Sequence, residues 1–168
     1  MIIVGYQGIG KSTLAKKSPL FIDLESSNFF IKNEETGEMI RDKNWYIPYC
    51  NIAVHLNQQG KHVFVSSHKE VRDRLIELDE KSLISCTPSL DFKDTWITKL
   101  RHRYLQSKLE KDYKAWKYAE AHYEESIKEI LRDIKHNVTI ETMDYDLEDI
   151  LTKVINRNTN HKWNDIFD

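Results

Sequence analysis

Short apolar runs alternate along the chain with stretches in which apolar residues recur every three or four positions. Short runs between turn signals are typical of buried strands, whereas the longer repeating stretches are typical of amphipathic helices. Their alternation indicates an α/β protein built on a parallel sheet. The pattern predicts strands at residues 1–4, 20–24, 62–65, 83–86 and 138–140, and helices at residues 10–17, 45–59, 69–78 and 146–155.

From residue 91 onward the pattern is helical, and we expect its apolar stripe to pack into the core. Residues 33–43 are polar with a glycine in the middle, which predicts a loop. The chain shows no internal repeat and no second composition class, so we expect one domain covering residues 1–168. The residues of the stripe are Leu105, Leu109, Tyr113, Trp116, Tyr123, Ile127, Ile130 and Ile134.

The composition is that of a soluble globular protein. Of the 168 residues, 40% are hydrophobic and 31% are charged, and the net charge is -2. This balance argues against disorder and against a nucleic-acid binder, which would need a clustered basic surface. No run approaches the roughly 20 apolar residues that span a bilayer, and the N-terminus lacks the features of a secretory signal. Cys50 and Cys86 lack a nearby partner, so we expect reduced structural thiols and a cytoplasmic protein.

Residues 5–12 read GYQGIGKS and match the pattern GxxxxGK[ST] between an apolar run and a helical stretch. Glycines let the backbone bend around an anion and bring N–H groups to phosphate oxygens, and the next helix adds its positive end. In such a loop Lys11 reaches the β- and γ-phosphates of ATP, and the Ser12 hydroxyl holds Mg²⁺. We therefore expect ATP and Mg²⁺ as cofactors, with the loop contacts made by Gly8, Ile9, Gly10, Lys11, Ser12 and Thr13.

The fuller spacing, GxxGxGKST, resembles the phosphate loop of nucleoside monophosphate kinases and of small metabolite kinases such as the shikimate and gluconate kinases. With the segments FIDLESSNF, from Phe21, and VFVSSH, from Val63, it is also similar to small deoxynucleoside monophosphate kinases of bacteriophages, which work in the host cytoplasm. The resemblance extends over most of the chain. It implies a three-layer α/β/α P-loop NTPase with a five-stranded parallel sheet, an acceptor-covering segment at about residues 26–60 and a helical lid at about residues 100–115.

Polar residues follow the second and third predicted strands, at the sheet edge where parallel α/β proteins bind ligands. Asp23 and Glu25 resemble, with one substitution, the Asp-x-Asp with which the metabolite kinases handle Mg²⁺ and the acceptor. On this resemblance Asp23 joins Ser12 as a metal-binding residue. The alternative for the pair is a helix cap followed by an exposed acid.

By the same resemblance, an arginine after the third strand clamps the acceptor phosphate, and lid arginines close on the transferred group. Arg72, Arg101 and Arg103 occupy these positions, although the family's spacing of lid arginines is not reproduced, and ordinary surface charges are the alternative. The expected catalytic residues are Lys11, Asp23, Arg72, Arg101 and Arg103. The expected acceptor-binding residues are Asp23, Glu25, Arg41, Trp45, Ser66, Ser67, His68 and Arg72.

The acceptor class stays open between two chemistries. A nucleoside monophosphate already offers an ionised oxygen as nucleophile, whereas a hydroxyl acceptor would benefit from a carboxylate base such as Asp23. The arginines and the aromatic segment near Trp45 favour the nucleotide. The alternatives are a hydroxyl-acceptor kinase of the shikimate or gluconate type and a non-enzymatic module whose ATP state controls a partner. We expect a small-molecule nucleotide as substrate and neither nucleic acid nor membrane as partner, and a homodimer stays open.

Overall fold

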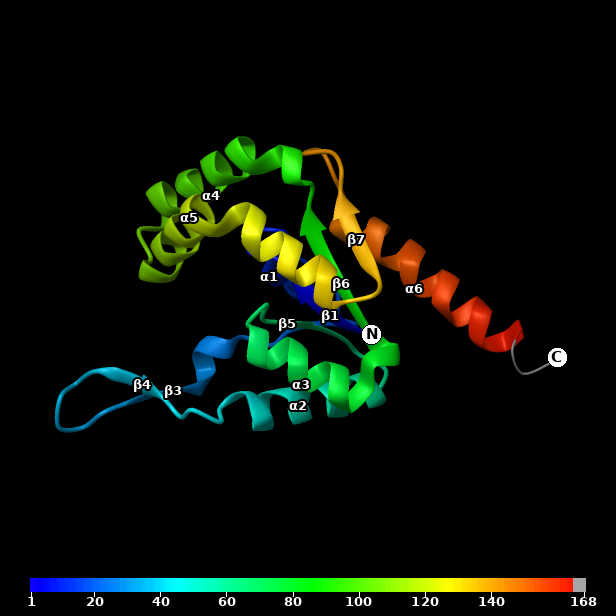
Figure 1. Ribbon diagram of the computed structural model, residues 1–168, viewed down its shortest axis with the longest axis horizontal. Helices are drawn as coiled ribbons and strands as arrows, with labels where there is room; N and C mark the ends of the chain where they lie inside the picture. The colour runs from blue at the N-terminus through cyan, green and yellow to red at the C-terminus, as the bar shows by residue number, and fades with distance from the viewer. Residues whose placement is uncertain (165–168) are drawn as a thin grey trace.

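A parallel sheet of five strands lies at the centre of the computed structural model, which describes the backbone of residues 1–164 and the side chains of residues 1–157 (Figure 1). The strand order across the sheet is β2-β5-β1-β6-β7. All five strands predicted from the sequence are confirmed, with ends that differ by at most two residues. The strands are β1 (Ile2–Gly5), β2 (Phe21–Asp23), β5 (His62–Val65), β6 (Leu83–Pro88) and β7 (Asn137–Ile140).

The central strands read as unbroken apolar runs because both of their faces are buried. Ile3 of β1 lies opposite Phe64 of β5 on one side and opposite Ile84 of β6 on the other. All three side chains are fully buried. The central strands therefore show no alternation of apolar and polar residues. Their short, continuous apolar runs were sufficient to predict the sheet.

Six α-helices are present in the described residues, and none of the helices described is long and apolar enough to cross a membrane. The helix α2 packs against β5 and β1, both α3 and α5 pack against β6, and α6 packs against β7. Two helix pairs, α2 with α3 and α4 with α5, lie side by side (Figure 1). The helices are α1 (Lys11–Lys17), α2 (Tyr46–Gln58), α3 (Lys69–Asp79), α4 (Lys93–Ser107), α5 (Glu110–Asp133) and α6 (Leu147–Asn164).

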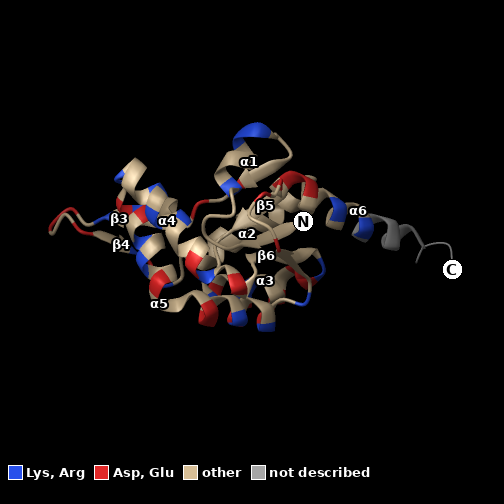
Figure 2. Cartoon of the chain, turned by 90° about the horizontal axis from the view of Figure 1, so that it is seen from above, with Lys and Arg blue, Asp and Glu red and all other residues tan. Residues whose placement is uncertain are grey.

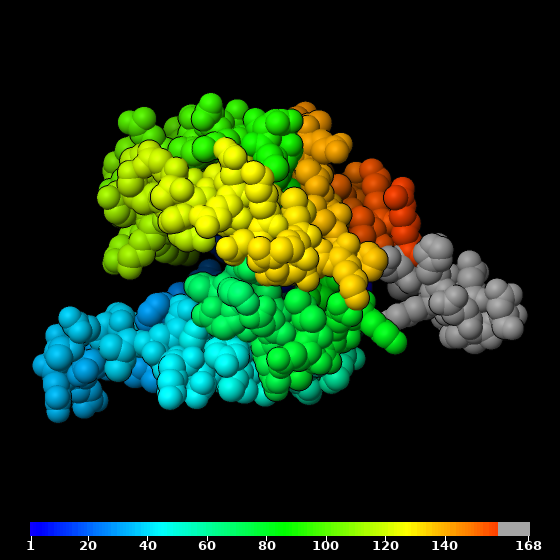
Figure 3. All heavy atoms as spheres, viewed as in Figure 1, coloured from blue at the N-terminus to red at the C-terminus, as the bar shows by residue number. Residues whose placement is uncertain are grey.

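The expectation of a loop at residues 33–43 is wrong in part, because this segment belongs to a β-hairpin. Strand β3 (Phe30–Lys32) pairs antiparallel with β4 (Met39–Arg41), and the hairpin projects from the body of the molecule (Figures 1 and 3). The Asn33 side chain accepts hydrogen bonds from the backbone N–H groups of Glu35 and Thr36, which closes the turn. The tip is acidic in character (Figure 2).

The apolar stripe after residue 91 is confirmed in its second half and wrong in its first. Tyr123, Ile127, Ile130 and Ile134 are buried, but the first members of the stripe, from Leu105 to Tyr113, are exposed. The stripe loses its register at two breaks, because α4 ends at Ser107 before α5 begins at Glu110, and α5 is itself kinked at His122, where φ is -132°. Between α4 and α5, Lys108 adopts the left-handed conformation with φ 55°, which turns the chain at a corner.

The carboxyl ends of β1, β2 and β5 meet at one edge of the sheet. A groove opens above this edge, between the side formed by α4 and α5 and the side formed by α2, α3 and the hairpin (Figure 3). The segments that follow the three strands line it, namely the glycine loop (residues 5–13), residues 24–27 and residues 66–68. The fold thus gathers the polar residues that the sequence places after these strands.

Candidate active site

The glycine loop turns sharply at two positive-φ positions between β1 and α1. Gly8 has φ 84° and Gly10 has φ 102°, conformations that L-residues with a Cβ adopt only with strain. A Cβ on Gly8 would also lie 2.8 Å from a methyl group of Leu100, and one on Gly5 would lie 2.7 Å from Cδ of Lys11. Glycine is therefore required here both by the backbone conformation and by close packing.

Three elements distant in the sequence hold the glycine loop in place. The buried indole of Trp96 in α4 donates from Nε1 to the carbonyl of Gln7 at 2.9 Å. The Gln7 amide donates to the carbonyl of Ala115 in α5 at 2.8 Å. The hydroxyl of Tyr145, which precedes α6, donates to the carbonyl of Ile9 at 2.9 Å. The loop is consequently fixed by α4, α5 and the β7–α6 connection before any ligand binds.

Lys11 begins α1 and folds back along the loop. Its Nζ donates to the carbonyl of Gly5 at 2.9 Å. Burial lowers the pKa of this ammonium group, the nearby carboxylate of Asp23 opposes that effect, and the positive charge of Arg103 adds to it. Two cations held close together at a glycine loop favour the binding of an anion between them.

Ser12 and Asp23 lie together at the ends of α1 and β2. The Ser12 hydroxyl donates to Oδ2 of Asp23 at 2.5 Å. Among the described residues, no group of three or more His, Cys, Asp or Glu side chains is placed to hold a metal ion by itself. One hydroxyl and one carboxylate beside a glycine loop fit Mg²⁺, because this ion usually keeps several waters and takes further ligands from substrate phosphates.

Two cavities flank the glycine loop. The β7 cavity, of about 340 Å³, lies between the loop, α1 and the start of α6, and the loop contributes Ile9, Gly10 and Thr13 to its wall. The β2 cavity, of about 330 Å³, lies in the groove and contains both Lys11 and Ser12 in its wall. A molecule that bridged the two cavities would pass directly over the loop.

The β7 cavity has a lysine that the sequence did not reveal. Lys99 donates from Nζ to the hydroxyl of Tyr145 at 3.1 Å and lies 4.2 Å from the centre of the Trp96 ring. Burial lowers the pKa of this ammonium group, and the charge of Arg103 lowers it further. Burial also raises the pKa of the Tyr145 phenol to about 12, so this hydroxyl stays protonated and remains a donor.

The wall of the β2 cavity opposite the loop carries hydroxyl, carboxylate and imidazole groups. Asp23, Glu25, Ser66, Ser67 and His68, all expected to contact the acceptor, line this cavity together. Ser66 and His68 are hydrogen-bonded to each other through Oγ and Nδ1. The structure thus brings together these five of the eight expected acceptor-binding residues.

The two expected lid arginines are placed differently. Arg103 lines the β2 cavity, and its Nη2 forms an ion pair with Asp112 at 2.9 Å. Arg101 is exposed, lies 5.7 Å from the centre of the Trp116 ring and is not in the cavity wall. The helix α4 continues to Ser107, so both arginines lie within a helix. Lysines and arginines recur along α4 and α5 near this end (Figure 2).

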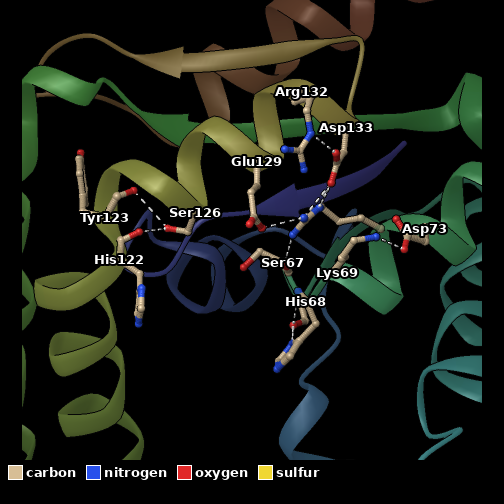
Figure 4. A network of polar contacts seen from close by, with 12 residues as sticks. Ser67, His68, Lys69, Asp73, His122, Tyr123, Ser126, Glu129, Arg132 and Asp133 are labelled. Carbon is tan, nitrogen blue, oxygen red and sulfur yellow. Dashed lines mark hydrogen bonds and ion pairs between the residues drawn. The ribbon is translucent and has the colours of Figure 1, made fainter.

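Arg72 lies outside the wall of the β2 cavity and belongs to a buried network (Figure 4). Its Nη2 bonds to Asp133 at 2.8 Å and to Glu129 at 3.3 Å, and its Nε also bonds to Asp133 at 3.0 Å. Its Nη1 donates to the carbonyl of Ser67 at 2.5 Å. In this arrangement Arg72 links α3 to α5 and holds the end of β5, and only 3% of its surface is exposed.

Arg41 and Trp45 lie behind the cavity rather than in its wall. The Arg41 guanidinium lies 4.0 Å from the centre of the Phe30 ring and 4.1 Å from that of Trp45. Trp45 is buried, and its ring meets His68 edge-on at 5.4 Å. These residues anchor the base of the hairpin next to His68.

Lys99, Tyr145 and Asp112 also lie in the two cavity walls and were not identified from the sequence. They lie in helices and connections without a local motif, and only tertiary packing brings them to the loop.

In comparisons with known proteins, no family model matches the chain, and no curated protein shows significant similarity to it. The functional interpretation therefore depends on the geometry of the glycine loop and its two cavities.

Proposed function

We propose that the chain is a P-loop NTPase of the three-layer α/β/α type that transfers the γ-phosphoryl group of ATP to a nucleoside or deoxynucleoside monophosphate. The observation that carries this proposal is the position of Lys11 and the Ser12–Asp23 pair at a glycine loop between two cavities. A donor nucleotide and an acceptor would then approach the same phosphate from opposite sides. Phosphoryl transfer depends mainly on such positioning and on charge neutralisation.

In this proposal the β7 cavity takes the nucleoside of ATP and the glycine loop takes its phosphates. Lys11 would contact the β- and γ-phosphates, while Ser12 and Asp23 would hold Mg²⁺ directly or through water. Bound Mg²⁺ would neutralise charge on the phosphates. Arg103, on the opposite side of the β2 cavity, would neutralise the charge that develops on the group in transfer.

The acceptor monophosphate would lie in the β2 cavity. Arg103 and Lys111 in its wall supply positive charge for an anionic acceptor, and Ser66, Ser67 and His68 supply hydrogen bonds. A second candidate, a hydroxyl-acceptor kinase, is supported by a specific observation. The wall near β2 carries Asp23 and Glu25, and Arg72, which was expected to clamp an acceptor phosphate, is bound to Asp133 instead.

The test is ADP release by the purified protein with ATP and Mg²⁺ against a panel of ribo- and deoxynucleoside monophosphates. We expect turnover that depends on one or a few monophosphates and that Lys11→Ala abolishes, because removal of this ammonium leaves phosphate charge uncompensated. Lys16→Ala is the matched control, because this exposed lysine lies on the same helix but in the wall of neither cavity. Turnover with sugars or other hydroxyl compounds alone would favour the second candidate. ATP binding without any acceptor-dependent turnover would favour a regulatory module.

A further inference from the structure

Asp112 is a buried carboxylate at the wall of the β2 cavity, in the first turn of α5. Its Oδ1 forms an ion pair with Nη2 of Arg103 at 2.9 Å, and its Oδ2 accepts a hydrogen bond from the Ser107 hydroxyl at 2.5 Å. Both partners lie on α4. One carboxylate therefore joins the two helices at the point where they approach the glycine loop.

The corner between α4 and α5 produces this contact. Arg103 and Ser107 are four residues apart and lie on the same face of α4. The left-handed conformation of Lys108 reverses the chain, and the Leu109 N–H donates to Ser107 Oγ at 3.2 Å. This turn brings the first turn of α5 back against α4, with Asp112 between Arg103 and Ser107.

The side chain of Arg103 extends from α4 toward the glycine loop. It shares the wall of the β2 cavity with Lys11 and Ser12, and its charge acts on both Lys11 and Lys99. The Arg103 side chain is 42% exposed and its ion pair with Asp112 is made through Nη2, so the other side of the guanidinium retains donor capacity. A fork with one side paired and donors left over is suited to binding a phosphate oxygen.

We propose that Asp112 is a positioning residue that holds the Arg103 guanidinium over the glycine loop, where it meets the terminal phosphate of the donor. The inference depends on the proposed function in assigning that phosphate to ATP. A flexible arginine loses conformational entropy when it binds, and a pre-formed ion pair removes part of this cost. Asp112 acts through Arg103 and does not itself contact the reacting atoms.

The opposing explanation is that Asp112 only stabilises the start of α5, where its negative charge interacts favourably with the positive end of the helix dipole. The two explanations differ in how Asp112 and Arg103 depend on each other. A positioning residue loses its effect once Arg103 is gone, so the double variant should bind phosphate no worse than the Arg103 variant alone. If Asp112 were purely structural, the double variant would show the loss of phosphate binding caused by the Asp112 replacement in addition to that caused by the Arg103 replacement.

The experiment measures binding of Mg²⁺-tripolyphosphate by calorimetry, which needs no acceptor, and then kcat and KM for any acceptor found. The variants are Asp112→Ala, Asp112→Asn, Arg103→Ala and the double variant Asp112→Ala with Arg103→Ala. Glu110→Gln is the control, because this residue lies in the same helical turn, is exposed and pairs with Lys114. Thermal unfolding of each variant confirms that it is folded.

We expect Asp112→Ala to weaken tripolyphosphate binding by roughly tenfold, within the range for directly coupled residues, and to have no further effect in the Arg103→Ala background. Asp112→Asn, which keeps the hydrogen-bonding oxygen, should recover part of the loss, and in turnover kcat should fall more than the KM for the acceptor changes. Additive losses, or tighter binding by Asp112→Ala, would overturn the inference. Coupled binding losses in a protein that turns over no acceptor would retain the inference and refute the proposed kinase.

Discussion

The buried network around Arg72 provides a direct test of whether this arginine is structural. Replacement by Met keeps much of the volume but removes the positive charge from a site where only 3% of the residue is exposed. Asp133, with 14% of its side chain exposed, would lose its buried partner, and the Ser67 carbonyl would lose its donor. Arg72→Met therefore leaves a carboxylate largely uncompensated near the junction of α3 and α5.

The decrease in the free energy of unfolding follows from this loss of a partner for Asp133. Breaking a buried ion pair on one side costs about 3–5 kcal/mol. Asp133 keeps a contact with Nε of Arg132 at 3.1 Å, so we expect the lower end, about 3 kcal/mol. For a chain of this size that corresponds to a decrease of roughly 6–12 °C in Tm. Replacing both partners, Arg72→Met with Asp133→Leu, should recover most of the loss because no unpaired charge then remains between them.

Urea unfolding followed by circular dichroism measures these differences. Arg74→Met is the matched control, because Arg74 lies on the same helix and pairs with the exposed Glu77, so we expect a change within about 0.5 kcal/mol. If Arg72→Met unfolded like the wild type while turnover was lost, the structural explanation would be refuted. Arg72 would then act on the acceptor, as the family resemblance implies.

Two further perturbations test the loop and the half-buried His62. Gly8→Ala should lower stability by about 2 kcal/mol or more and weaken nucleotide binding, since it adds a methyl collision to the cost of φ 84°. Gly37→Ala, at φ 74° with open space around it, should show the conformational cost alone, and equal effects would contradict the packing argument. Burial and the nearby N-terminal ammonium group lower the pKa of the half-buried His62 to about 4. The stability contributed by its neutral form, about 1–2 kcal/mol after solvent screening of this partly exposed ring, should therefore be lost as pH falls from about 6.5 to 4. His62→Gln should flatten the stability profile in that window, and an unchanged profile would argue against this assignment.

The sheet could be predicted from the sequence because its strands are continuous apolar runs between turn signals. The hairpin could not be predicted in this way, because its strands are three residues long and expose Ile31 and Met39 to solvent. The break after Ser107 was also missed, since Lys108 adopts the left-handed conformation without a glycine or proline to mark it. Both features depend on tertiary contacts and local turns rather than on apolar periodicity.

In the candidate site, too, the features set by a local motif could be predicted, and those that depend on tertiary contacts could not. The glycine loop is a local motif, and its Lys11 and Ser12 lie where the motif places them. The arginines depend on partners far away in the sequence. Arg72 meets Asp133, which lies 61 positions further along the chain, and that carboxylate, rather than the sequence near Arg72, decides where its guanidinium points. Spacing along a helix cannot reveal such a partner.

The hydrogen bond between Trp96 and the glycine loop gives the protein a built-in optical reporter. A buried indole bonded to the Gln7 carbonyl is sensitive to any shift of that carbonyl, so its fluorescence should respond when the loop binds an anion. Trp45 contacts His68 at the other wall of the groove and should respond to the acceptor instead. Replacing Trp116 and Trp163 with Phe would leave only these two signals, and a further replacement of either ring would separate them. Donor and acceptor occupancy could then be followed in one unlabelled sample, in real time.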